Sequence, residues 1–203
     1  EDLPLRVFVH SVRSCASHRH RECELLLGLQ GEVIVHTAVG ETVLGPDDLC
    51  FIPAHELHLT RGATAGNLVA TLQLDPALVA RLDPEFPRRR FAFNDLARRR
   101  RDDARLQAVR GLLAEIFWEM RLRRPGHRLM VESLALRLIA LLVREIPSEL
   151  SPLPPSAVRS ETDEVLGQRL ARIVAFVETH SGEELSSIQV ADTENVSASY
   201  LAR

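Results

Sequence analysis

A change in the spacing of apolar residues near Asp75 and Pro76 constrains the fold more than any other feature of the sequence. Before it, apolar residues come in short bursts separated by glycines and prolines at nearly regular intervals, which is typical of an antiparallel sandwich or barrel. The bursts are Val7 to Val9, Leu25 to Leu27, Val33 to Val35, Val43 and Leu44, Leu49 to Ile52, and Leu68 to Leu74. The sequence therefore predicts an all-β barrel over residues 1–76.

Two amphipathic helices are predicted after this barrel. Apolar residues from Leu106 to Met120 recur at the i, i+3, i+4, i+7 spacing of a helix face, and Pro125-Gly126 ends the pattern. A second helix from about Leu129 to Val143 is apolar on more than one face. One face can meet the barrel and another a partner subunit, so residues 77–146 are predicted to form a connector and a dimerisation segment of a homodimer.

The segment 147–163 has a different composition, with Pro152, Pro154 and Pro155 among Ser, Glu and Thr. Such a segment cannot continue a helix and has little to bury, so we interpret it as a linker. Apolar residues at helical spacing resume after it, which indicates that an all-α domain begins within residues 164–203. The predicted fold class is mainly β plus α.

Composition excludes several classes of protein. Hydrophobic residues make up 45% and charged residues 26%, which is ordinary for a globular protein and unlike a disordered one. All 25 basic residues are Arg, but the formal net charge of -3 gives no strong field to attract nucleic acid. The three cysteines match no disulfide or zinc spacing, and no apolar run reaches the roughly 20 residues of a membrane span. We expect a soluble, cytoplasmic protein.

Three histidines and one glutamate form the candidate site. Residues two apart in a strand face the same side, so His18 and His20 can both point into the barrel, and Glu24 keeps that parity if the strand continues. His58 would arrive from a neighbouring strand. Imidazoles and a carboxylate suit a divalent transition ion such as Zn, Ni, Mn or Fe, with positions left open for water or ligand.

The same residues resemble the cupin family. The segment H-R-H-R-E-C-E-L-L-L-G-L-Q-G, from His18 to Gly31, is similar to the first cupin motif, and P-A-H-E-L-H, ending at His58, is similar to the end of the second. The resemblance departs at His55, where the family has glycine. Regulatory cupins also bind organic effectors without metal, so a metal and a small molecule both stay open.

Residues beside the cluster have secondary roles in this interpretation. His55 and Glu22 are candidates for contact with an effector or for support of the metal ligands. The isolated His10, His36, His127 and His180 are interpreted as surface or capping residues. The run Arg98 to Arg101 is followed by Asp102 and Asp103, so we interpret it as a solvated helix start.

The last residues predict a helix-turn-helix. A short helix ends after Ala191, Asn195 can adopt a left-handed conformation, and Ser197 can cap the next helix. This stretch resembles the first helix-turn-helix of the AraC/XylS family of transcription regulators. The resemblance implies that the helix starting at Ser197 enters the major groove, with Ser199 and Arg203 facing the bases. That family carries a second such motif, which is expected after Arg203.

Together these features predict a transcription regulator rather than an enzyme. Its effector would be a small molecule or a metal bound in the barrel, and its partner would be promoter DNA, bound through the complete C-terminal domain. The family resemblance favours an activator. The alternative is a metal-dependent cupin enzyme, a dioxygenase or isomerase, in which the same four residues hold a catalytic ion.

Overall fold

The computed structural model describes residues 3–80, 82–93 and 103–151, together with Phe176, Thr179, His180, Ser186 and Gln189. The chain divides into two compact units, residues 1–155 and 156–203. Nearly all of the described residues belong to the first unit. The predicted helix-turn-helix in 164–203, with Ser199 and Arg203, and the run Arg98 to Arg101 lie outside the described residues.

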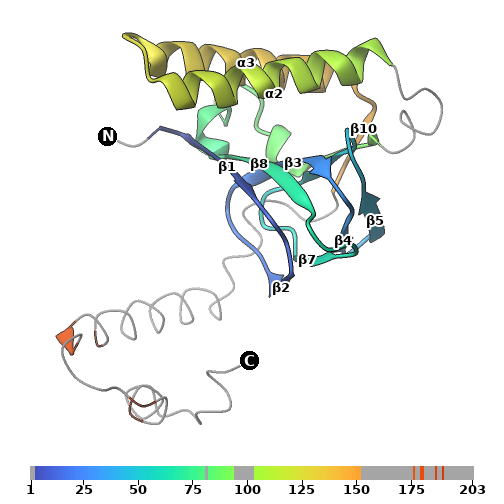
Figure 1. Cartoon of the computed structure of the whole chain (residues 1–203). Helices are drawn as coiled ribbons and strands as arrows, with labels where there is room; N and C mark the ends of the chain where they lie inside the picture. Colours follow the sequence, from blue (N-terminus) through green and yellow to red (C-terminus); the bar gives the residue numbers. More distant parts are fainter. Residues whose placement is uncertain are drawn as a thin grey trace. The chain divides into compact units, whose positions relative to one another are not determined.

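Eight strands form two antiparallel sheets of four strands each, in the orders β1-β8-β3-β6 and β2-β7-β4-β5 (Figure 1). The first sheet contains β1 (Leu5–His10), β8 (Leu68–Leu74), β3 (Cys23–Gln30) and β6 (Leu49–Ile52). The second contains β2 (Ser14–His18), β7 (His58–Gly62), β4 (Val33–Thr37) and β5 (Gly40–Leu44). The predicted barrel is therefore a sandwich of two facing sheets.

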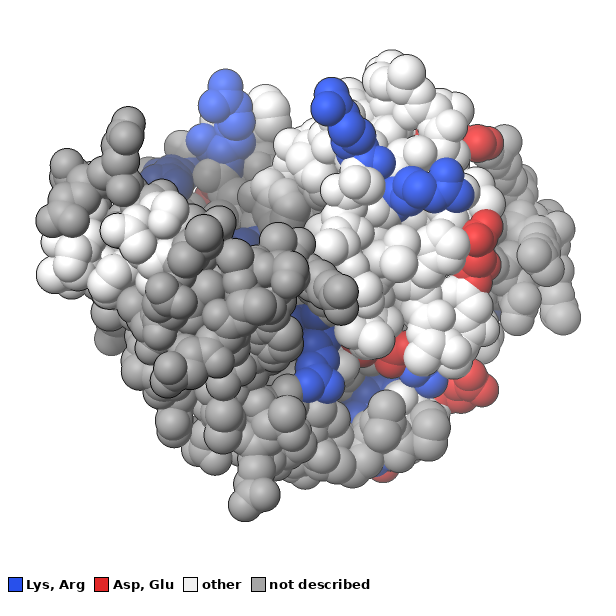
Figure 2. All heavy atoms as spheres, turned by 90° about the horizontal axis from the view of Figure 1, so that it is seen from below, with Lys and Arg blue, Asp and Glu red and all other residues white. Residues whose placement is uncertain are grey.

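Charged side chains are dispersed on the side of this sandwich that faces away from the helices. Figure 2 shows described arginines and acidic residues scattered around a mainly uncharged surface. The described residues visible in this view form no continuous cationic track for a phosphate backbone. The observation agrees with the low net charge of the sequence.

The strands of the first sheet are apolar because the sheet is buried on both faces. On one face Leu26, Ile52 and Val69 meet Val33 and Val35 of the second sheet. On the other face the sheet packs against the helices. Burial on both sides explains why Leu25 to Leu27 and Leu68 to Leu74 are nearly continuous apolar runs rather than alternating ones.

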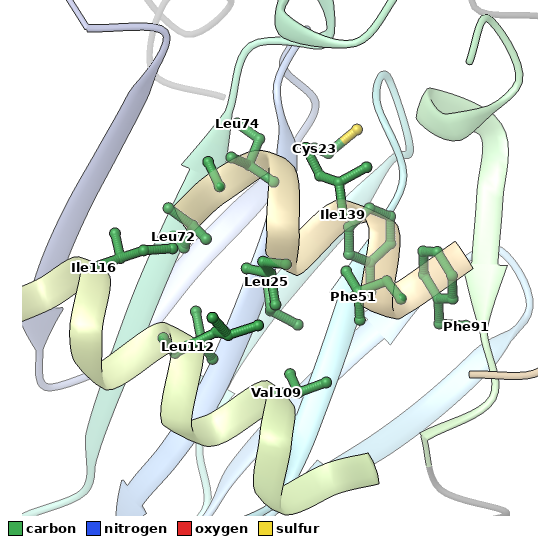
Figure 3. Close-up of a cluster of buried hydrophobic side chains, with 14 of the residues drawn as sticks. Cys23, Leu25, Phe51, Leu72, Leu74, Phe91, Val109, Leu112, Ile116 and Ile139 are labelled. Atoms are coloured by element: carbon green, nitrogen blue, oxygen red, sulfur yellow. The ribbon is translucent and has the colours of Figure 1, made fainter. Parts of the chain in front are cut away.

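The helix layer consists of α2 (Ala104–Leu122) and α3 (His127–Glu145), which confirms the two predicted helices. The Asp103 side chain caps α2 by accepting a hydrogen bond from the Arg105 N–H, and Arg123 ends it in a left-handed conformation. Figure 3 shows Leu112 and Ile116 of α2 and Ile139 of α3 against Leu25 and other residues of the sheet. No described helix has the length and apolar character needed to cross a membrane.

The connector contains η1 (Pro76–Leu78), η2 (Phe86–Arg88) and β9 (Arg89–Phe91). β9 pairs antiparallel with β10 (Ser148–Leu150), which lies in the segment predicted as a linker. The linker prediction is wrong for these three residues, because their backbone pairs with the edge of β9. One hydrophobic core runs from the first sheet through Phe86 and Phe91 to both helices, so it continues across the predicted boundary at residue 76.

Candidate metal centre

Four predicted ligands meet at one end of the sandwich. His18, the last residue of β2, lies directly opposite His58, the first residue of β7, in the strand pairing. His20 follows in the loop after β2, and Glu24 is the second residue of β3. One ring nitrogen from each histidine lies within 4.8 Å of the others, a spacing at which they could hold a metal ion.

The path of the chain to Glu24 differs from the prediction. Glu24 would keep the parity of His18 and His20 if one strand continued through them, but β2 ends at His18 and β3 begins at Cys23 in the other sheet. The loop between them carries His20 across from one sheet to the other. The four side chains converge because both sheets end here, and not because they share the face of one strand.

Backbone carbonyls fix the orientation of all three rings. His18 Nδ1 lies 2.9 Å from the Ala16 oxygen, His20 Nδ1 lies 3.1 Å from the Glu22 oxygen, and His58 Nδ1 lies 2.8 Å from the Glu56 oxygen. A carbonyl oxygen only accepts hydrogen bonds, so in each neutral ring Nδ1 carries the proton. Each Nε2 then has a free lone pair, which is the form of histidine that binds a metal.

Glu24 brings a negative charge into this buried cluster. One carboxylate oxygen accepts a hydrogen bond of 3.0 Å from Gln73, and the other lies 3.6 Å from His58 Nε2 and 3.9 Å from His20 Nε2. Burial alone would raise the pKa of Glu24, but the contacts with His20 and Gln73 outweigh it and lower the pKa. Glu24 is therefore ionised at neutral pH and attracts a cation.

The two histidines next to Glu24 respond differently. The Glu24 carboxylate raises the pKa of His20, whereas burial lowers the pKa of His58. The Nε2 atoms of both are buried and have no hydrogen-bond partner among the described residues. Buried nitrogens left without a partner are costly, and a metal ion between them and Glu24 would satisfy them. The residues present thus fit a divalent transition ion.

A cavity of about 250 Å³ adjoins the cluster inside the sandwich. Its wall includes His18, Glu24 and His58, together with Thr71 and Gln73 from β8, which the sequence reasoning missed. Polar residues at alternate positions of an apolar strand were the signal that could have found them. His10, expected at the surface, also lines this cavity.

The two supporting candidates lie on either side of the cluster. His55 sits in the turn before β7 with a φ of 61°, and its backbone N–H donates to the His20 oxygen over 2.8 Å. That left-handed conformation favours glycine, which explains why histidine is unusual there. Glu22 lies 3.7 Å from His20 Nδ1 and also contacts Arg6 and Arg21.

Gly31 completes the first motif for a steric reason. Its φ is 61°, and a Cβ atom built on it would lie 2.5 Å from the Thr64 hydroxyl. Any side chain would strain the turn between β3 and β4. The motif spacing therefore reflects both the ligands and the turn that follows them.

Comparison with known proteins agrees with this architecture. The model for the AraC-like ligand binding domain matches residues 7–139, which include both sheets, the four candidate ligands and most of the helix layer. The chain belongs to this family. No curated protein matches the chain.

Solved structures similar to this AraC-like ligand binding domain overlap it over about a third of the chain. They include a cupin superfamily protein from Desulfitobacterium hafniense DCB-2, with 24% identity over 34% of this chain and 64% of that chain and a TM-score of 0.31. KdgF from Halomonas sp. has 19% identity over 36% and 72%, with a TM-score of 0.34. Oxalate decarboxylase OxdC from Bacillus subtilis has 18% identity over 36% and 22%, with a TM-score of 0.34. Likenesses at this level say nothing about what the chain binds.

The cysteines of this AraC-like ligand binding domain should differ sharply in reactivity. All three are free thiols; Cys15 is exposed, while burial raises the pKa of Cys23 and of Cys50 to about 12. Because the thiolate is the reactive form, we expect a thiol reagent at pH 8 to modify one cysteine in the native chain and three in denaturant. Cys15→Ser should abolish the native reaction. Rapid modification of a second thiol in the native chain would contradict the burial.

Proposed function

We propose that this chain is the sensing part of a transcription regulator that responds to a metal ion, a small molecule, or both, bound in the sandwich. The observation that carries the proposal is the group of three oriented imidazoles and one ionised carboxylate beside an internal cavity, in a chain of the AraC-like ligand binding domain family. His18, His20, Glu24 and His58 would hold the ion. When bound, the ion would supply open coordination positions for an effector in the cavity.

Hydrogen bonds lead from this site toward the end of the domain, which supports a sensing role. Glu56, whose backbone oxygen accepts from His58, forms a buried ion pair with Arg90 of β9 over 2.5 Å. β9 pairs with β10, and Arg88 donates to the Ser151 oxygen over 2.9 Å. A change in the position of His58 would therefore alter these contacts up to Ser151, where the chain leaves the domain. Binding shifts such an arrangement only if the effector prefers one state.

DNA reading and dimerisation are the remaining parts of the proposal. The resemblance of residues 164–203 to a helix-turn-helix supports promoter DNA as the partner, with activation as the outcome. Exposed apolar side chains on the helix layer, Trp118, Leu129 and Met130, support a homodimer. Such residues on a helix surface are suited to contact with a second copy.

The regulator proposal predicts DNA binding that depends on the metal. We would select duplexes from a random pool with the complete polypeptide that the gene encodes, and measure affinity with Zn²⁺ or Ni²⁺ and with chelator. Allosteric coupling is typically about 5- to 150-fold, so we expect a change within that range. Arg203→Ala should weaken specific binding, whereas Arg61→Ala, an exposed arginine of β7, should not. Failure to select any sequence would contradict the regulator proposal, and equal affinity in both conditions would exclude the metal ion as the signal.

A metal-dependent enzyme is the second candidate, because three histidines and a glutamate beside a cavity also suit a catalytic ion. A dioxygenase or isomerase would need substrate turnover by the metal-loaded chain. A regulator would bind its effector and release it unchanged. Recovery of the bound small molecule after incubation, analysed by mass spectrometry, separates the two functions.

A further inference from the structure

A second cavity, of about 740 Å³, lies where the start of the chain and the loop after β2 approach the connection between α2 and α3. It is distinct from the cavity at the histidines, although Gln73 lines both. Four arginines line it, against two acidic residues, Glu22 and Asp75. The lining is therefore positive in a chain whose formal net charge is -3. The four are Arg6, Arg21, Arg123 and Arg128.

Arg6, Arg21 and Arg123 in this lining are exposed to solvent. Arg21 contacts Asp75 and Glu22, and Arg6 lies 3.8 Å from Glu22 with 69% of its side chain exposed. Exposed ion pairs of this kind are weak and exchange readily for a better partner. Arg123, at the end of α2, has no acidic partner among the described residues. The cavity thus holds more positive charge than its own carboxylates neutralise.

The first turn of α3 adds to the positive potential. Gly126 precedes this helix without a side-chain cap, and the first turn contains no acidic residue. His127 and Arg128, the first two residues of the helix, both line the cavity. The backbone N–H groups and the dipole at such a helix start favour an anion. The N–H groups and the helix dipole therefore add to the positive potential that the arginines produce in the cavity.

We propose that this cavity binds a phosphate-bearing small molecule. Phosphate oxygens match the forked donors of arginine, and the arginines of this cavity come from the start of the chain, the loop after β2 and the region between α2 and α3. The volume is that of a site for a small organic ligand rather than for a single ion. This site is separate from the metal centre, so it would give the protein a second input.

Isothermal titration of the full chain tests the proposal, with inorganic pyrophosphate and glucose 6-phosphate as two separate probes. The titration is done on metal-free protein in chelator, so that neither probe can bind through a metal ion. We expect saturable 1:1 binding of at least one probe, weakened by added salt because the arginines are exposed. The tighter probe shows whether the natural ligand is an inorganic or an organic phosphate.

Matched variants separate a built site from general attraction to charge. Arg123→Gln should weaken binding about tenfold, and Arg121→Gln, which removes the same charge from the same helix outside the cavity, should leave it unchanged. No saturable binding, or equal losses from Arg121→Gln and Arg123→Gln, would overturn the proposal. Displacement of the probe by duplex DNA of random sequence would also overturn it in favour of a nucleic-acid surface.

Discussion

His20→Ala is expected to weaken the binding of Zn²⁺ or Ni²⁺ by at least about 100-fold, because even the outer partners of metal ligands are worth roughly 10- to 100-fold. The variant removes one of the three imidazole nitrogens and leaves only His18, His58 and Glu24 as donors to the ion. His20 is the best ligand to replace because it lies in the loop after β2. His58 is buried in a strand, and its loss could disturb the fold.

The control for this experiment is His36→Ala. His36 lies on β4 of the same sheet as His18 and His58, and it pairs with Glu41 over 3.3 Å, away from the cluster. Metal content by elemental analysis and affinity by competition with a chromogenic chelator should match those of the unaltered chain. Equal and negligible metal in the unaltered chain and in His20→Ala would exclude the metal and leave a purely organic effector.

The site could be predicted as a set of residues but not as a geometry. The spacing of His18, His20 and Glu24 picked out side chains that the structure gathers with His58. The two strands that carry His18 and His58 contain mostly polar or small residues, so neither β2 nor β7 gave an apolar burst. The sequence therefore contained the candidate ligands but no signal for the strands that position them.

Gln73 shows that contacts between residues far apart in the sequence could not be predicted. It holds the Glu24 carboxylate from β8, 49 residues away in the sequence, and local patterns contain no information about that pairing. The apolar runs of the first sheet and the period of both helices were readable because each depends on burial along one segment. Contacts between segments, such as β9 with β10, depend on the register of the whole fold.

Ile116→Ala is expected to lower the free energy of unfolding by roughly 2 to 5 kcal/mol, because this side chain packs between the sandwich and the helices. Ile116 is fully buried on α2 within the core cluster that also contains Leu25 and Leu72 of the sheet. Removing its side chain leaves a cavity between the two layers. Denaturant unfolding followed by the fluorescence of Trp118, the only tryptophan, measures the loss in the helix layer.

The same titration shows whether the two layers are one cooperative unit. Because one core cluster spans them, the histidine NMR signals of the sandwich should disappear at the denaturant concentration at which Trp118 fluorescence changes, and Ile116→Ala should shift both midpoints together. Leu82→Ala, a change at a side chain 75% exposed outside the helices, should alter stability by less than about 0.5 kcal/mol. Separate midpoints would mean that the helix layer can detach while the metal centre stays intact. A shared midpoint means that the helix layer and the sandwich that carries His58 unfold as one cooperative unit, so that neither layer keeps its structure without the other.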